Sequence, residues 1–424
     1  MGNKRVKGIY SVYHAQRGIE RKTFSDRIRL QIDVYKRQYV VFALWNFPLW
    51  LLSRLGGLEI LYLPPCVMWA KSMLLVFLWL AAKGLDGICQ AMEMKERERR
   101  LACCLFLTST LTISALCVLS QYDIIGISLM LWGIKFYMEG DTRKFLLFFA
   151  LSVPMKLFTL MAFAPLVLLR EKRVERILGQ LLCGVSLLAI CRLVFSSSTG
   201  GDGLIWFVFK NTAQISVGTV YFFVFAMAVL MLICYIKPYR QGQEQNQWAI
   251  YFCLAAYGIF FSTAYTYPYW TIFMAPFISL LMAQNSRFLR VNLLLDLVLS
   301  CGIQLAYIFE FPWCFGGANC SSMLLNFMQK GQRLDPIWDT ESLLSSLFPG
   351  RENAAVYAIG LGISAFLAAL LLFMVVNNPL LSRKLPLLES VPEKPERFFW
   401  GLRIIAGMAL CFVPVAFYMM SFIL

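Results

Sequence analysis

A lysine in the middle of an apolar run is the first residue of this sequence that could do chemistry. Lys156 follows a proline in the stretch SVPMKLFTLMAFAPLVLLREKR (residues 152–173), which ends in a burst of basic residues. A lysine inside a membrane costs about 2.5–3.5 kcal/mol on insertion scales, so it marks a candidate functional site. An anionic lipid head group or a diphosphate would offset that cost as a charge-assisted partner. We therefore predict that Lys156 binds an anion.

Two further stretches carry groups that could act with this lysine. In SQYDIIG, the residues Gln121, Tyr122 and Asp123 are expected to form a tight turn in which Asp123 is the only charge. An aspartate here could also act as the N-cap of the helix that follows. In STAYTYPYWTIFMAPF, the rings could form a stacked floor for a sugar or an interfacial aromatic belt. They are Tyr265, Tyr267, Tyr269 and Trp270.

The composition decides what kind of element must position these groups. The chain has 424 residues, of which 59% are hydrophobic and 15% charged. A helix needs about 20 apolar residues to cross the hydrocarbon, and long runs without alternation exclude a β-barrel. The sequence therefore predicts an all-α, polytopic transmembrane helical bundle with about 11–13 membrane segments.

The expected segments are the long apolar runs of the chain. They cover residues 39–54, 63–82, 101–119, 124–138, 145–169, 177–195, 213–236, 248–264, 271–282, 291–309, 354–376 and 399–422. Residues 1–38 are polar and basic, and residues 39–424 are expected to form one transmembrane domain with an extracytoplasmic loop at 310–353.

The basic residues predict the orientation of these segments. With the N-terminus in the cytoplasm, connectors on that side hold 29 of the 39 lysines and arginines, and the opposite side holds 4. This asymmetry follows the positive-inside rule and predicts a multi-pass protein of the cell membrane with a cytoplasmic N-terminus. The net charge of +15 therefore needs no nucleic-acid partner.

The count requires residues 145–169 to enter and leave on the cytoplasmic side, because basic residues flank both ends of the segment. We expect a re-entrant hairpin of two short helices that turns at VPMK, where proline breaks the hydrogen-bond ladder. The alternative is one kinked crossing with Lys156 snorkelling to the interface. Arg403 and other cations near segment ends are expected to snorkel, whereas Asp296 could pair across the bundle.

From the turn at Gln121 to the basic exit after Leu169, the sequence resembles the core of polyprenyl-phosphate-sugar-dependent mannosyltransferase relatives of bacteria, which are GT-C class integral-membrane glycosyltransferases. Their Gly-Gln-aromatic-Asp turn is matched by Gln121, Tyr122 and Asp123, with Ser120 in place of glycine, and their intramembrane lysine is matched by Lys156. The segment YPYWTIFMAPF is similar to their later aromatic-proline segment. The resemblance covers roughly residues 100–290.

The resemblance implies transfer of a hexose or mannose-like sugar from a polyprenyl-phosphate-linked donor to an extracytoplasmic lipid or glycan acceptor. This reaction would belong to cell-envelope glycan assembly, and membrane lipids would surround the protein. Lys156 would bind the donor phosphate, and Gln121, Tyr122 and the four aromatic residues would contact substrate. Such transfer needs one carboxylate base and no cofactor. With His14 as the single histidine, neither a His-based triad nor a His-rich zinc site is expected.

The sequence departs from this family at the carboxylate that acts as the base. In the family the base lies in the first large outer loop, but the loop LGGLEILYLPP here offers only Glu59. Asp123 is the second candidate. IDVYKRQ at 32–38 resembles sequence that recurs at broken ends of assembled environmental sequences, so we expect the natural first helix and its acidic loop to be missing. The alternatives are a multi-pass transporter or lipid flippase, and an inactive fragment of the enzyme.

Overall fold

The computed structural model describes residues 38–56, 64–194, 216–217, 220–236, 242–264, 266–311, 354–381 and 396–423. This part of the chain is helical apart from a short hairpin of β1 (Ser216–Val217) and β2 (Val220–Tyr221). The first helices are α2 (Gln38–Gly56), α3 (Pro64–Ala91), α4 (Glu96–Leu107), α5 (Thr110–Ile113), the π-helix η2 (Ser114–Val118), α6 (Asp123–Met138) and α7 (Thr142–Met155).

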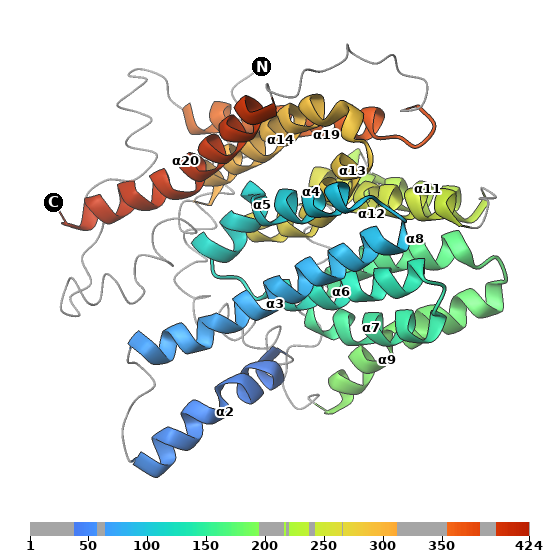
Figure 1. Ribbon diagram of the computed structural model, residues 1–424, viewed down its shortest axis with the longest axis horizontal. Helices are drawn as coiled ribbons and strands as arrows, with labels where there is room; N and C mark the ends of the chain where they lie inside the picture. Colours follow the sequence, from blue (N-terminus) through green and yellow to red (C-terminus); the bar gives the residue numbers. More distant parts are fainter. Residues whose placement is uncertain are drawn as a thin grey trace.

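The chain continues as a series of helices to its C-terminus. They are η3 (Leu157–Thr159), α8 (Leu160–Arg170), α9 (Val174–Val194), α11 (Phe222–Ile236), α12 (Gln243–Thr263), η4 (Pro268–Phe273), α13 (Ala275–Gln284), η5 (Ser286–Phe288), α14 (Leu289–Glu310), α19 (Ala354–Val376) and α20 (Glu396–Ile423). Figure 1 shows α14, α19 and α20 along one side of the bundle and α6, α7 and α9 along the other, with α4, α12 and α13 between them.

Each apolar segment expected from the sequence contains a helix in the structure. Among the described residues, five helices are long and apolar enough to cross a membrane, and a sixth span is possible if α4 and the α5–η2 helix count as one span bent by 44°. Three shorter apolar helices, at 40–55, 157–170 and 222–236, add to these. The all-helical architecture with several candidate membrane spans is therefore confirmed, whereas the number of about 11–13 membrane segments stays a prediction.

The helix ends that carry basic connectors meet at one end of the bundle. Gln243, at the start of α12, donates a hydrogen bond to Glu93, just after α3. Gln245 donates to the Tyr137 hydroxyl at the end of α6, and Lys172, between α8 and α9, donates to the carbonyl of Cys234 in α11. We call this end of the molecule the basic end. Asp123 starts α6 at the opposite end, about 21 Å from Tyr137 at a rise of 1.5 Å per residue.

A buried polar stripe on α14 ties the C-terminal helices to the core. Asn292, Asp296, Ser300 and Gln304 recur every four residues and are each at most 2% exposed. A spacing of four advances about 40° per step around a helix of 3.6 residues per turn. The stripe therefore meets a different partner at each level: Asn377 just after α19, Arg403 in α20 and Ser114 in η2.

The expectation that Arg403 snorkels to the interface is wrong. The Arg403 side chain is 2% exposed, and its Nε donates to Asp296 Oδ2 at 2.5 Å. Its Nη atoms donate to the carbonyls of Leu105 and Thr108 and to the Thr108 hydroxyl. Arg403 therefore donates to carbonyls that have no helical partner because the helix breaks between α4 and α5. A cation at this helix end also complements the helix dipole. The pairing of Asp296 across the bundle is confirmed.

Helices α14 and α19 touch through glycines, which gives the first testable prediction. A Cβ atom at Gly362 would lie 2.5 Å from the Gly302 carbonyl oxygen, whereas a Cβ at Gly360 would meet nothing within 4 Å. We expect Gly362→Ala to lower stability by about 1–3 kcal/mol through overpacking. Gly360→Ala should leave stability unchanged or raise it slightly, because alanine favours helix. Thermal unfolding of the two purified variants measures the difference, and equal melting temperatures would contradict the close helix contact.

Candidate functional site

Helices α7 and α8 form the hairpin that was expected around Lys156. Phe163 of α8 stacks on Phe149 of α7 with ring centroids 4.8 Å apart, and Phe145 lies 5.4 Å from the same ring. At the far end of α8, Arg170 donates to the carbonyl of Tyr137, next to the start of α7. Both arms therefore begin and end at the basic end, and Lys156 lies at the tip.

Local sequence explains why the helix breaks at Lys156. Pro154, inside the last turn of α7, has no backbone N–H to donate to the ladder. The next residue but one, Lys156, adopts an extended backbone (φ −152°, ψ 119°) before the short helix η3 begins. Thr159 then donates its hydroxyl to the Lys156 carbonyl and closes the turn.

Lys156 and Asp123 form an ion pair at the tip of the hairpin. The Lys156 Nζ atom lies 2.8 Å from Asp123 Oδ1, and the side chains are 11% and 2% exposed. The N-cap position of α6 belongs to Tyr122, and Asp123 makes no capping bond, so the capping interpretation of Asp123 is wrong. Gly126 lets the two elements approach, because a Cβ there would meet Lys156 Cβ at 3.2 Å.

Three aromatic rings surround the Lys156 ammonium group. Its Nζ lies 5.1 Å from the ring centroid of Trp270, 5.3 Å from Phe158 and 5.7 Å from Tyr269. Cation–π attraction acts over such distances. Tyr267 stacks on Tyr269 at 5.7 Å and so extends this aromatic cluster by one ring.

The structure thus joins two of the sequence stretches to Lys156 but not every residue predicted within them. Gln121 donates to the Leu119 carbonyl in its own turn, and the Tyr122 ring packs edge-on against Phe42 of α2. Neither side chain forms a hydrogen bond or a cation–π contact with Lys156. Glu59 and Tyr265 lie outside the described residues.

Phe158 is the contact residue that the sequence did not reveal. It lies two positions after Lys156 and is one of 35 phenylalanines in an apolar chain, so its residue type did not mark it as part of a site. Its place after the hairpin turn, facing η4, depends on tertiary packing. The Phe158 ring lies 4.5 Å from that of Trp270.

A second cation reaches the turn that precedes Asp123. Lys71 of α3, which is exposed, donates to the Ser120 hydroxyl at 3.0 Å. Ser120 has a positive φ of 49°, the conformation for which glycine is favoured. The glycine of the resembled family therefore fits this position physically, and Ser120 occupies it here with a hydrogen bond to Lys71.

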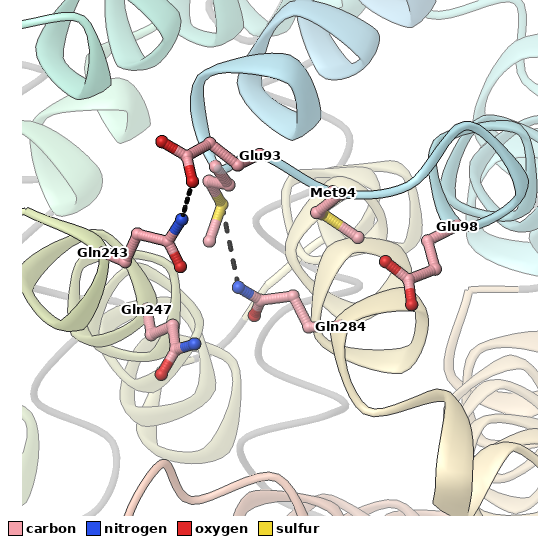
Figure 2. A pocket seen from close by; sticks show the side chains of 7 residues that line it. Glu93, Met94, Glu98, Gln243, Gln247 and Gln284 are labelled. Atoms are coloured by element: carbon pink, nitrogen blue, oxygen red, sulfur yellow. Dashed lines mark hydrogen bonds between the residues drawn. The ribbon is translucent and has the colours of Figure 1, made fainter.

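Two cavities lie at the basic end, away from Lys156. One, of about 160 Å³, is lined by Met92, Glu93, Met94, Glu98, Gln243, Gln247 and Gln284. Figure 2 shows the Gln243 amide pointing at the Glu93 carboxylate. The Gln284 amide donates a hydrogen bond to the sulfur of Met92. The other, of about 270 Å³, shares Gln247 and Gln284 and continues to Asn285 and Asn377. Neither cavity contains a residue predicted from the sequence to act on a substrate.

No protein-family model, curated protein or solved structure gives a significant match to this chain. The chemistry of the site must therefore be argued from its own groups. Within the described ranges, no cluster of three or more His, Cys, Asp or Glu side chains could hold a metal ion. What the tip of the hairpin offers is a cation, a carboxylate and a set of aromatic faces.

Proposed function

We propose that this protein is an integral-membrane glycosyltransferase with a GT-C-like fold. It takes a hexose or mannose-like sugar from a polyprenyl-phosphate-linked donor and passes it to an extracytoplasmic lipid or glycan acceptor in cell-envelope glycan assembly. One observation carries the proposal: the Lys156 ammonium, at the tip of a helical hairpin, lies within 5.1–5.7 Å of three aromatic ring centroids. A cation suits a phosphate, and aromatic faces suit the C–H face of a sugar.

The distribution of charge supports an orientation for this site. The connectors with most of the lysines and arginines meet at the basic end, which we place in the cytoplasm together with the N-terminus. Lys156 and Asp123 then lie in the outer half of the membrane, at the depth where a lipid-linked phosphate from the outer leaflet arrives. The hairpin enters and leaves on the cytoplasmic side, and its irregular backbone at the tip is covered by protein, as the bilayer requires.

In the proposed reaction, the bond between the anomeric carbon and the donor phosphate oxygen breaks while the acceptor oxygen bonds to that carbon. The polyprenyl phosphate leaves with the electron pair, and the acceptor proton passes to a carboxylate base. Lys156 has three N–H donors and gives one to Asp123. The other two are available to the departing phosphate.

The geometry argues against Asp123 as that base. In an inverting transfer the base and the leaving group lie on opposite faces of the sugar, and in inverting glycosidases the two catalytic carboxyl groups, one on each face, stand roughly 6.5–9.5 Å apart. Asp123 Oδ1 lies only 2.8 Å from the Lys156 Nζ atom that would hold the leaving phosphate. Asp123 is therefore proposed to position Lys156. Glu59 remains a sequence prediction.

A multi-pass transporter is the second candidate function, and the buried ion pairs favour it. Asp123–Lys156 and Asp296–Arg403 are acid–base pairs of a kind that proton-coupled transporters use. Uptake into vesicles that depends on a proton gradient would support this alternative.

Sugar transfer tests the proposed function directly. We expect membranes containing the full chain to move labelled sugar from polyprenyl-phosphate donors to lipid acceptors, and Lys156→Ala to lower the rate by at least about 100-fold, as for loss of an electrostatic group at a reacting centre. Lys144→Ala, which removes an exposed lysine at the basic end, is the matched control and should transfer normally. Equal rates for both variants would overturn the assignment of Lys156.

A further inference from the structure

One oxygen of the buried ion pair has no partner. Asp123 Oδ1 accepts from Lys156, but Asp123 Oδ2 is buried and has no hydrogen-bond partner among the described residues. Hydrogen bonds to charged groups are among the stronger ones in proteins, and a buried acceptor left unsatisfied is costly. The missing partner of Oδ2 is a hydrogen-bond donor.

The charge of the site decides which kind of donor suits it. Asp123 and Lys156 together are neutral. The Lys156 ammonium already lies 2.8 Å from Asp123 Oδ1, so a second cation beside Oδ2 would be repelled by it. A hydroxyl carries no charge and meets no such repulsion. The carboxylate is acceptor-only when ionised, so a ligand O–H complements it.

The surrounding aromatic rings favour a sugar as the class of ligand. The faces of Trp270 and Tyr269 turn toward Lys156 with their planes at 85° to each other. Aromatic faces carry a negative quadrupole, which favours polarised C–H groups. A sugar ring is the ligand class that presents hydroxyl donors at its edge and C–H groups on its face.

We propose, on the basis of the function proposed above, that Asp123 Oδ2 accepts a hydrogen bond from the 2-hydroxyl of the donor sugar. The 2-hydroxyl is next to the anomeric carbon that carries the phosphate. Asp123 Oδ1 contacts the Lys156 ammonium that would bind the phosphate. The second oxygen of the same carboxylate would therefore lie within reach of that hydroxyl. Asp123 becomes a specificity-determining residue that reads the sugar while Lys156 holds its phosphate.

Access to this acceptor requires a side chain to move. Oδ2 is covered by protein, whereas Lys156 is 11% exposed. The Lys156 side chain contacts both the carboxylate and the three rings, and its shift toward an arriving phosphate is the movement proposed to uncover Oδ2. Binding of the phosphate and binding of the sugar are then coupled through one lysine.

The test compares two ligands on three forms of the detergent-purified full chain. Mannosyl-phosphoryl farnesol and its 2-deoxy analogue are titrated against wild type, Asp123→Asn and the matched control Asp141→Asn. The pKa of Asp141 is lowered by the backbone N–H of Lys144, so the control also loses a charged aspartate, at the opposite end of the hairpin. Asparagine is an equally good N-cap for α7.

We expect wild type and Asp141→Asn to bind the 2-deoxy analogue about 10-fold more weakly than the mannosyl ligand, and Asp123→Asn to bind the two ligands equally. Equal binding of both ligands by wild type would overturn the proposal, and this measurement does not depend on any variant folding. A 10-fold preference that Asp123→Asn retains would also overturn it. If wild type binds neither ligand but binds bare farnesyl phosphate, the sugar subsite fails while a lipid-phosphate site stands. Binding of none of the three by wild type contradicts the proposed function itself.

Discussion

Arg403→Met is expected to destabilise the protein by about 3–5 kcal/mol, because it leaves the carboxylate of Asp296 buried without its cation. Arg403 also serves the carbonyls of Leu105 and Thr108 at the break between α4 and α5. Its loss therefore removes the donors to Asp296 of α14 and to the C-terminal end of α4 at once. Thermal unfolding of the detergent-purified variant and its yield as a monodisperse species measure the effect.

The double variant Arg403→Met with Asp296→Leu separates the charge from the packing. Removing both charges of a buried pair is often close to neutral, whereas removing one is not. The double variant should therefore melt above the single Arg403→Met variant. Arg54→Met, at an exposed arginine that lies over the Trp50 ring, is the control and should change stability by less than about 1 kcal/mol. A double variant that is no more stable than the single one would contradict the charge explanation.

Lys156→Met is the second substitution with a large expected effect. Both carboxylate oxygens of Asp123, which is 2% exposed, would then be buried without a described partner. We expect a loss of about 3–5 kcal/mol, as for other buried pairs broken on one side. Adding Asp123→Asn should recover part of that loss, because asparagine carries no charge.

The matched control for this prediction lies at the other end of the hairpin. Lys144 pairs with Asp141 at 3.0 Å, but its side chain is 57% exposed, so Lys144→Met should cost no more than about 1 kcal/mol. Melting curves of these three variants and of wild type give the comparison. Equal melting temperatures for Lys156→Met and Lys144→Met would contradict the larger contribution of the buried pair to stability.

Apolar periodicity and charge were sufficient to predict the helices of this fold. Long apolar runs such as residues 354–376 contain a helix with the same bounds, α19 (Ala354–Val376), because a bilayer leaves a long apolar segment few alternatives. The hairpin around Lys156 followed from basic residues at both ends of one segment. A proline two residues earlier supplied its turn.

Partners that depend on tertiary packing could not be predicted in the same way. Arg403 lies near the start of α20, where a cation normally reaches the interface, and only the position of Asp296 and the break after α4 show that it turns inward. At the candidate site, the sequence marked Asp123, Lys156 and Trp270 as separate stretches. Their meeting depends on how α6, the hairpin and η4 pack, and no pattern within one segment encodes it.

A phosphate site at Lys156 is tested most directly by mapping where a lipid phosphate binds. A farnesyl phosphate with a diazirine in its first isoprene unit would be photolysed with the full chain, and the labelled peptides identified by mass spectrometry. We predict label at the hairpin tip (residues 154–160) or in η4, and we expect excess unlabelled ligand and Lys156→Met each to suppress it. Label confined to lipid-facing helices such as α9, or to the cavities of the basic end, and unaffected by Lys156→Met, would contradict a phosphate site at Lys156.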